Sequence, residues 1–376
     1  MQIKYAFFWL NILSIIHLNG AYGQECIDKE ANILTKRLYE NIYNLKDSLT
    51  IFGHQDALAY GVGWKGIKGK SDIYDVVKDY PGLYGWDIAN IELGRSKNID
   101  GVPFKKMKEY ILDAFGRGSL ITISWHANNP LTGKNAWDTS QGTVSSILPG
   151  GSNHKKYTRW LDRIAEFLKS LQTKAGIGIP ILFRPFHELT GSWFWWGKNF
   201  CTNREFIELW KFTQNYLKDQ KNIHQLIYVF NTANFANKEE YLSRYPGDDK
   251  VDILSFDQYQ YEGSTGKKIF LETMNHQLKI LTSLGKTHNK IISIAETGFE
   301  AVPDPVWWTG TLYPLLKDFP VSSVLVWRNA GLMKNSNKMH YYAPFPGQIS
   351  EMDFKLFYQS DKMLFGNQLK NITIYH

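Results

Sequence analysis

The sequence predicts an α/β protein built as a single (β/α)8, or TIM, barrel. Eight short apolar runs recur along the chain, and stretches with helical spacing separate them. Continuously apolar strands that alternate with helices are typical of a parallel sheet covered by helices, and eight such units close into a barrel. The eight predicted strands span residues 50–53, 83–87, 120–125, 180–185, 226–231, 253–257, 291–295 and 323–327.

Two of the segments between the strands have the pattern of amphipathic helices. Their apolar residues recur every three or four positions, which places them on one helix face. We expect these side chains, the aromatic ones included, to pack in the core. The two patterns comprise Trp160, Leu161, Ile164, Phe167, Leu168 and Leu171, and then Phe206, Leu209, Trp210, Phe212 and Leu217.

The N-terminal segment has the features of an export signal. Lys4 supplies a positive start, residues 5–18 are mostly apolar, and the sequence AYG at 21–23 fits a small-x-small cleavage site. The apolar run falls short of the ~20 residues that span a bilayer, and no second long run follows. We therefore expect a signal peptide at 1–23, one domain at 24–376, export to the periplasm or the medium, and no membrane insertion.

Composition and charge favour some partners and exclude others. Hydrophobic residues make up 43% of the 376 residues, which suffices for a large core. The net charge of +7 comes with interspersed acidic residues and no dense Lys/Arg tract, so we expect a solvated surface and no nucleic-acid binding. Aromatic residues make up 15%, which raises the expectation of carbohydrate binding because aromatic rings stack on sugar faces.

Polar residues cluster where each apolar run ends. In a TIM barrel the carboxyl ends of the strands build the active site. A polar residue at one such position can simply cap a helix, but eight such endings together favour a functional site. The endings are GHQD (53–56), WDIAN (86–90), SWHANNP (124–130), RPFHE (184–188), FNTAN (230–234), FDQY (256–259), AETG (295–298) and VWRN (326–329).

Two glutamates follow the fourth and seventh predicted strands. Glu188 ends the run ILFRPFHE, and Glu296 ends the run IISIAE. The ends of these two strands face each other across the mouth of an eight-stranded barrel. Cleavage of a glycosidic bond requires one carboxyl group to protonate the leaving oxygen and a second to attack the anomeric carbon or to activate water. Salt bridges are the structural alternative, but two opposed glutamates in polar clusters favour catalysis.

Arg184 and His187 lie close to Glu188 in the sequence. Arg184 precedes it by four residues, on the same strand face, where a guanidinium could hold a carboxylate ionised or form a structural ion pair. His187 fits a catalytic or sugar-binding role and a structural role equally well. The sequence HELTG lacks the second His of HExxH, and no other metal-ligand spacing appears. We therefore expect neither a metal nor an organic cofactor.

A tryptophan-rich loop follows Glu188. Its sequence at 190–197 is TGSWFWWG, and three indoles in a Gly-flanked loop are hard to bury together. At least one of them is therefore expected to stack on a sugar. Trp327 and Arg328, after the last strand, could extend the same cleft. For Trp307 and Trp308 we favour core packing.

Cys26 and Cys201 are the two cysteines of the chain. Export permits a disulfide, although two cysteines do not make a disulfide scaffold. We expect Cys201 at the rim formed by the carboxyl ends of the strands, and Cys26 at the start of a helix that also begins near this rim. Because the first and fourth strands lie half a barrel apart, the pairing is left open.

The blocks RPFHEL and TGSWFWWG, together with SFDQY and AETG, resemble glycoside hydrolase family 26. The similarity extends from GHQDALAYG (53–61) to VWRNA (326–330), and RPFHE with SWFWWG is its specific part. The resemblance implies a retaining TIM-barrel glycosidase with catalytic carboxylates on strands four and seven. The family consists mostly of endo-β-1,4-mannanases. Smaller branches cleave mixed-linkage β-glucan or β-1,3-xylan, and some mannanases release mannobiose from chain ends.

The resemblance also implies roles for individual residues. Glu188 would be the acid/base and Glu296 the nucleophile. Tyr259 would hydrogen-bond the nucleophile, and Trp327 would form the platform under the glycone sugar. The residues expected to bind substrate are His126, Arg184, His187, Trp193, Asp257, Tyr259, Trp327 and Arg328. Less recognisable are the loops at 65–72 and 133–152.

Three functions are open at this point. The first is a retaining enzyme that cleaves β-1,4-mannosidic linkages in mannan, galactomannan or glucomannan, either internally or by releasing mannobiose. The second is a β-glucanase (lichenase) or β-1,3-xylanase of the same family. The third is a non-catalytic carbohydrate-binding protein, which would have no need of two opposed carboxylates. We expect a monomer.

Overall fold

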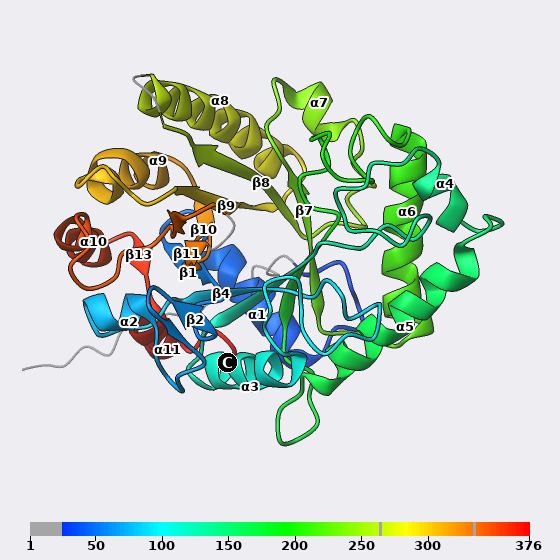
Figure 1. Ribbon diagram of the computed structural model, residues 1–376, viewed down its shortest axis with the longest axis horizontal. Helices are drawn as coiled ribbons and strands as arrows, with labels where there is room; N and C mark the ends of the chain where they lie inside the picture. Colours follow the sequence, from blue (N-terminus) through cyan, green and yellow to red (C-terminus); the bar gives the residue numbers. More distant parts are fainter. Residues whose placement is uncertain (1–24, 263–264, 334–335) are drawn as a thin grey trace, which may run out of the picture.

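The computed structural model describes residues 25–262, 265–333 and 336–376, and within them it has the predicted (β/α)8 barrel (Figure 1). The predicted signal peptide at 1–23 lies outside the described residues. Eight parallel strands follow one another around the ring, and β10 pairs with β1 to close it. The strands are β1 (Thr50–Gln55), β4 (Leu83–Asp87), β5 (Leu120–Trp125), β6 (Ile181–Pro185), β7 (Leu226–Thr232), β8 (Ile253–Gln260), β9 (Ile291–Phe299) and β10 (Val321–Val326).

All eight predicted strands are confirmed. The predicted bounds of β4 and β5 agree residue for residue with the structure. Strands β8 and β9 are longer than predicted, because their polar ends continue to pair as far as Gln260 and Phe299. The apolar runs thus locate the strands, and the polar endings of two strands still belong to the sheet.

Two apolar layers hold the barrel together. Alternate strand residues point inward, where aliphatic side chains fill the lower half of the barrel, while the helices pack against the outside. Helix α1 (Ile33–Leu45) closes the bottom by packing Leu38, Tyr39 and Ile42 against the inner layer. The inner layer comprises Ile51, Leu83, Leu120, Leu182, Ile227, Val229, Ile253, Ile291 and Leu325.

The outer helices include the two predicted ones, α5 (His154–Ser170) and α6 (Asn203–Asn215). Helix α6 begins at a capping box in which Thr202 and Glu205 exchange hydrogen bonds. Of the helices in the described ranges, none is both long and apolar enough to cross a bilayer. The remaining helices are α2 (Asp72–Val77), α3 (Phe104–Gly116), α4 (Thr143–Ile147), α7 (Lys238–Leu242), α8 (Gly266–Thr287), α9 (Tyr313–Asp318), α10 (Glu351–Tyr358) and α11 (Gly366–Ile372), with π-helical turns at Tyr216–Gln220 and Trp308–Leu312.

Three short strand pairings were not predicted. Strands β2 (Tyr60–Gly61) and β3 (Trp64–Lys65) form a hairpin after β1, and β11 (Gly331–Met333) and β12 (Lys338–His340) form another after β10. The two residues of β13 (Met363–Leu364) pair with β1. Runs of two or three residues are too short to show an alternating pattern. Both hairpins follow the carboxyl ends of their strands, so they extend the rim of the barrel.

Cys26 and Cys201 lie at opposite ends of the barrel, which corrects the expectation that both lie near the carboxyl-end rim. Next to Cys26, Ile27 donates its N–H to Oδ1 of Asp252 at 2.8 Å, and Asp252 immediately precedes β8 at the amino ends of the strands. Cys201 follows β6, and its thiol lies 3.5 Å from the carbonyl oxygen of Trp196. Both thiols are free. The disulfide is absent because the chain enters beneath the barrel.

Candidate active site

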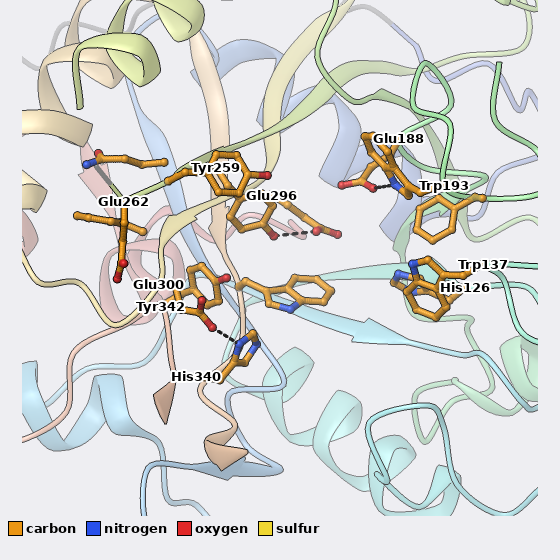
Figure 2. Close-up of a pocket in the computed structure, with 15 residues that line it drawn as sticks. His126, Trp137, Glu188, Trp193, Tyr259, Glu262, Glu296, Glu300, His340 and Tyr342 are labelled. Atoms are coloured by element: carbon orange, nitrogen blue, oxygen red, sulfur yellow. Dashed lines mark hydrogen bonds and ion pairs between the residues drawn. The ribbon is translucent and has the colours of Figure 1, made fainter. Parts of the chain in front are cut away.

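A cleft of about 480 Å³ opens where the carboxyl ends of the strands meet (Figure 2). Loops after β5, β6, β8, β9 and β10 supply its walls. Of the ten predicted site residues, those that line it are His126, Glu188, Trp193, Tyr259, Glu296 and Trp327. The lining residues that the sequence analysis did not single out are Trp137, Phe194, Gln260, Tyr261, Glu262, Phe299, Glu300, His340 and Tyr342.

Glu188 lies just beyond β6 and is partly buried. Phe186 and Glu188 both have left-handed backbone conformations, with φ of 55° and 53°, so the chain turns sharply where the carboxyl group enters the cleft. The indole Nε1 of Trp193 donates to Oε2 of Glu188 at 2.6 Å. Burial and the negative charge of Glu296 raise the pKa of Glu188 to about 7. This carboxyl group can therefore hold a proton near neutral pH, as a general acid must.

A β-bulge in β9 aims Glu296 into the cleft. Strands β8 and β9 pair regularly up to Phe256 and Ile294, which both face the outer helices. The next pair joins Asp257 to Glu296, so Ala295 is an extra residue, and the pairing of β9 with β10 shifts at the same place. Without the extra residue, Glu296 would share the outward face of Ile294. The bulge instead turns its carboxylate inward.

Two donors hold the carboxylate of Glu296. Arg184 donates from Nη2 to Oε1 at 2.6 Å, and the hydroxyl of Tyr259 donates to Oε2 at 2.9 Å. The predicted hydrogen bond between Tyr259 and Glu296 is therefore present. Each oxygen of Glu296 is fixed by a separate donor, which orients the carboxylate and suits its anionic form.

Arg184 and Asp257 lie beneath Glu296, and their side chains are only 2% and 1% exposed. Arg184 donates from Nη1 to Asn231 Oδ1 at 2.7 Å and lies 3.6 Å from Asp257 Oδ2. Burial and the charge of Glu296 raise the pKa of Asp257 well above its usual range. Both residues were expected to bind substrate, but neither lines the cleft, whereas the expectation that Arg184 could hold a carboxylate agrees with its bond to Glu296. They lie beneath the carboxylate of Glu296, so they contact Glu296 and each other and act on the substrate only through it.

The carboxyl groups of Glu188, Asp257 and Glu296 form a tight cluster. One carboxylate oxygen from each lies within 4.8 Å of the other two. Nearest oxygens no more than 4.8 Å apart agree with the ~5–5.5 Å separation of the carboxyl groups in a retaining pair. Three carboxylates this close could also hold a cation, but the guanidinium of Arg184 already lies against Asp257 and Glu296. Chemistry without a metal stays a prediction.

His126 and His187 contact each other beside this cluster. Their Nε2 atoms are 3.2 Å apart, and Nδ1 of His126 lies 2.8 Å from Oδ2 of Asp87. His126 lines the cleft, whereas His187 is buried and does not. The prediction that His187 would bind the sugar is corrected accordingly. Because the chain turns at Phe186, the His187 ring points to His126.

One of the three indoles in the loop at 190–197 is available to a sugar, as predicted. Trp193 is 43% exposed, whereas Trp195 and Trp196 are fully buried and donate their indole N–H groups to backbone carbonyls. The ring of Trp193 lies so close over Gly191 that a Cβ there would come within 2.5 Å of it. Because Gly191 has no Cβ, the Trp193 ring can pack directly against the backbone there.

Trp327 and Trp137 add further aromatic surface to the cleft. Trp327 follows β10 and is partly exposed. Trp137 is 47% exposed, and its ring lies nearly parallel to that of His126, with centroids 5.3 Å apart. It belongs to the loop at 133–152, which carries no recognisable motif, so only the tryptophan content of the chain could have suggested it. Buried in the core, as expected, are Trp307 and Trp308.

Arg328 follows Trp327 but faces a neighbouring pocket. Its Nη1 lies 2.5 Å from Asp100 Oδ1 and 3.3 Å from the hydroxyl of Tyr60. This pocket, of about 650 Å³, is lined by residues of both rim hairpins, β2–β3 and β11–β12. The structure thus places Arg328 beside the main cleft, where it could contact only a part of the substrate that extends beyond Trp327.

The fold and the site together define the class of protein. A (β/α)8 barrel whose strand ends carry two opposed carboxyl groups, one with a raised pKa and one held by two donors, has the arrangement of a retaining glycoside hydrolase. The family profile described as glycosyl hydrolase family 26 matches residues 27–301, and the chain belongs to that family.

Solved structures and curated sequences show the same relationship. A family 26 β-mannanase from Bacteroides ovatus is 43% identical with a TM-score of 0.87, and the match covers 92% of this chain and 98% of that one. A modular endo-β-1,4-mannanase from Cellulomonas fimi is 29% identical with a TM-score of 0.81, over 92% and 78% of the two chains. A mannan endo-1,4-β-mannosidase from Bifidobacterium adolescentis is 29% identical over 91% of this chain and 35% of that protein. This chain spans about a third to a half of the first curated relatives.

Proposed function

We propose that the chain is a retaining β-mannanase that cleaves β-1,4-mannosidic linkages in mannan, galactomannan or glucomannan. The observation that carries the proposal is the pair Glu188 and Glu296. One oxygen of each lies within 4.8 Å of the other, the raised pKa of Glu188 favours a proton on it, and two donors hold the carboxylate of Glu296. The choice of mannan is supported by the similar enzymes from three bacteria, each of which is named for its action on mannan.

In the first step, Glu296 attacks the anomeric carbon while Glu188 protonates the departing glycosidic oxygen. Arg184 and Tyr259 hold the attacking carboxylate in place, so little reorganisation is needed. The bond from the anomeric carbon to the leaving sugar breaks as the bond to Glu296 forms. The product is a glycosyl ester on Glu296, and the leaving sugar carries away the proton of Glu188.

In the second step, Glu188 acts as a base. Once Glu296 is esterified, its negative charge no longer raises the pKa of Glu188, so Glu188 remains ionised more readily. It removes a proton from water, the water oxygen attacks the anomeric carbon, and Glu296 leaves as a carboxylate. Two inversions restore the original anomeric configuration.

Two aromatic side chains distinguish the side of the cleft that binds the leaving sugar from the side that binds the sugar attached to Glu296. Trp193 hydrogen-bonds Glu188, which places it with the proton donor and the leaving sugar. Trp327 follows β10, the neighbour of the strand that carries Glu296, so we place it under the sugar that becomes attached to Glu296. His126 and Tyr259 complete the walls between them.

Product profiling tests the proposal and separates the alternatives. The enzyme and its Glu296→Ala variant are incubated with linear mannan, galactomannan, lichenan and β-1,3-xylan, and the products are sized. We expect mannan-specific products that depend on Glu296, and mannobiose as the sole early product would indicate chain-end action. Preferred cleavage of lichenan or xylan would reassign the substrate. Binding of mannan without any hydrolysis would support a non-catalytic protein.

A further inference from the structure

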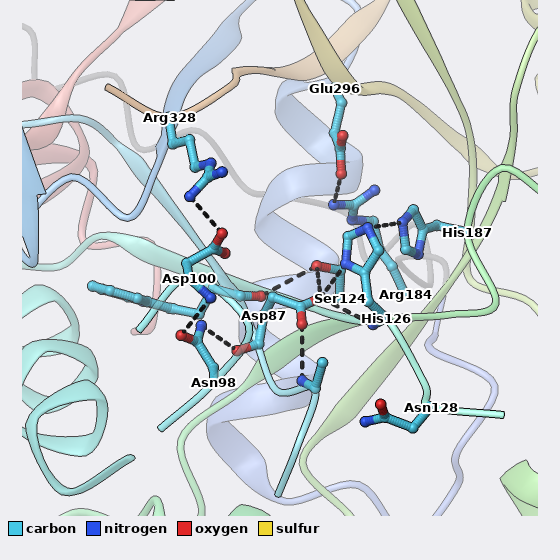
Figure 3. Close-up of polar contacts among 12 residues, drawn as sticks. Asp87, Asn98, Asp100, Ser124, His126, Asn128, Arg184, His187, Glu296 and Arg328 are labelled. Carbon is cyan, nitrogen blue, oxygen red and sulfur yellow. Dashed lines mark hydrogen bonds and ion pairs between the residues drawn. The ribbon is translucent and has the colours of Figure 1, made fainter. Parts of the chain in front are cut away.

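Asp87, the last residue of β4, is a buried anion outside the catalytic carboxyl pair (Figure 3). Its Oδ1 accepts the N–H of Ala89 at 2.8 Å, and its Oδ2 accepts the hydroxyl of Ser124 at 2.9 Å and the backbone N–H of His126 at 3.1 Å. Burial alone would raise the pKa of Asp87, but the His126 ring and these donors outweigh it and lower the pKa. Asp87 is therefore ionised and can only accept hydrogen bonds.

An ionised Asp87 fixes the tautomer of His126. Nδ1 of His126 lies 2.8 Å from Oδ2 of Asp87, and because the carboxylate has no proton, Nδ1 must carry the hydrogen. In neutral His126, Nε2 then carries no hydrogen and acts as a hydrogen-bond acceptor. That atom lies 3.2 Å from Nε2 of His187, and Figure 3 shows the three side chains in one row.

The contact between the two Nε2 atoms holds a single proton. When His126 is neutral, His187 must donate from its own Nε2. The Nδ1 atom of His187 then carries no hydrogen. Among the described residues no hydrogen-bond partner reaches Nδ1 of His187, so a proton placed there would be a buried donor without an acceptor. Burial, together with His126 and Arg184, also holds the pKa of His187 well below its usual range.

We propose that Asp87 is a positioning residue, which sets the proton arrangement of the His126–His187 pair and thereby fixes the His126 ring in the cleft beside Glu188. The proposal rests on the proposed function, because His126 matters to catalysis through the same cleft. Neutral His126 uses both ring nitrogens within the protein, so its ring is a fixed wall that stacks on Trp137. Protonation of His126 reverses the Nε2 contact and forces a proton onto the unpartnered Nδ1 of His187.

Asp87 also influences Glu188, because it helps to set the charge of the neighbouring His126 ring. Burial would lower the pKa of His126, but Asp87 outweighs it and the pKa is raised. A charged His126 in turn lowers the pKa of Glu188. The titratable groups that face His126 are Asp87 of β4, Asp100 of the loop before α3, His187 and Glu188 after β6, and Glu296 of β9. Of these, Asp87 has the largest influence.

The first test needs only the unmodified protein. Nitrogen NMR shifts of isotope-labelled histidine, with His126 assigned through His126→Asn, report which ring nitrogen is protonated and at what pH the ring titrates. We expect the Nδ1–H tautomer for neutral His126 and a pKa above the ordinary 6.5. The other tautomer, or a pKa below 6.5, would overturn the proposal whether or not any Asp87 variant folds.

The second test compares Asp87→Asn with Ser124→Ala. Ser124 bonds the same carboxylate oxygen but carries no charge, so its variant is the matched control. In Asp87→Asn we expect the pKa of His126 to fall, because the charge and the hydrogen bond of Asp87 are what raise it, and the alkaline limb of kcat/KM to move to higher pH because Glu188 loses a positive neighbour. Ser124→Ala should leave both unchanged. A folded Asp87→Asn protein with an unchanged His126 titration would refute the assignment.

The tautomer of His126 can be measured independently of whether the protein hydrolyses mannan. In the Glu296→Ala variant, which should not turn over, His126 should keep the Nδ1–H tautomer because its partners Asp87 and His187 are unchanged. A protein that fails to hydrolyse mannan but shows this tautomer would reject the β-mannanase function alone. A mannan-cleaving protein with the other tautomer would reject the role of Asp87 alone.

Discussion

The indole N–H of Trp193 donates to Oε2 of Glu188 at 2.6 Å, so a ring that is 43% exposed in the cleft is tied directly to the proposed acid. Burial and the charge of Glu296 raise the pKa of Glu188 to about 7, and the contact with Trp193 opposes that rise. The side chain that we propose to contact the leaving sugar therefore also lowers the pKa of the proposed acid.

Trp193→Phe should shift the pH profile of the enzyme. The change keeps an aromatic ring but removes the N–H that lowers the pKa of Glu188, so this pKa should rise. Because the acid must be protonated in the first step, the alkaline limb of kcat/KM should move to higher pH. Trp137→Phe is the control, since Trp137 lines the same cleft but does not bond Glu188. A profile that moves equally in both variants would argue against the contact.

Changes to the two glutamates should have different effects. Glu296→Ala should abolish turnover on every substrate, because no other group can form the ester. Glu188→Ala should slow mannan hydrolysis by about 10²–10⁴-fold, the usual contribution of general acid–base catalysis. With an aryl mannobioside, whose leaving group needs little protonation, the first step should survive and a burst of released phenol should be seen. Proton NMR of the early product should show the retained anomer, and an inverted anomer would contradict the assignment.

Arg184→Met should destabilise the fold. The change leaves the carboxylate of Glu296 buried without its cation, and breaking a buried pair in this way typically costs about 3–5 kcal/mol. Urea unfolding should show the loss as a lower midpoint. Arg204→Met, which breaks the exposed pair with Glu208, is the control and should leave the midpoint unchanged. Equal midpoints for the two variants would mean that Arg184 is not the counter-charge of the cluster.

Trp327→Ala should affect catalysis more than folding. The ring lines the cleft, so its removal should lower kcat/KM by roughly fivefold, which corresponds to about 1 kcal/mol of lost stacking. Trp307→Ala is the opposite case, because Trp307 is fully buried and its removal should lower stability by about 3–5 kcal/mol. If Trp327→Ala mainly unfolds the protein, the ring has a packing role.

We also propose that the protein is exported and processed near Gly23. The support is the sequence of the N-terminal segment, with its charged start, apolar run and small-residue site. Mass spectrometry of the exported protein should find an N-terminus close to Gln24. Exported material that still begins with Met1 would show that the segment is not removed.

Much of the fold could be predicted because buried parallel strands are continuous apolar runs. The run at Leu120–Trp125 is a clear case, since its bounds in the sequence and in the structure agree. Glu188 and Glu296 could be predicted as a pair because both follow such runs at opposite positions of the ring. Two-residue strands such as Tyr60–Gly61 carry no pattern, and their pairing depends on a turn that sequence spacing does not reveal.

Other features depend on relationships between distant segments. The bulge at Ala295 is a shift in the pairing register of β9 with its two neighbouring strands. The local sequence of β9 therefore does not predict it. Asp87 stands in one of the polar strand endings, but its importance comes from His126, 39 residues further along the chain. The site of Cys26 was mistaken for a similar reason, because it depends on how the chain enters beneath the barrel before α1.

The raised pKa of Glu188 has a consequence for the durability of the protein. The folded state keeps this proton up to about pH 7, whereas an unfolded chain releases it near the ordinary value of 4.5. The stability that this carboxyl group allows is therefore fully present below about pH 4.5 and is lost as the pH rises to about 7. The shift corresponds to about 3 kcal/mol, a large share of the net stability of an ordinary domain. The property that makes Glu188 useful as an acid thus also makes the folded barrel more fragile in neutral and alkaline surroundings.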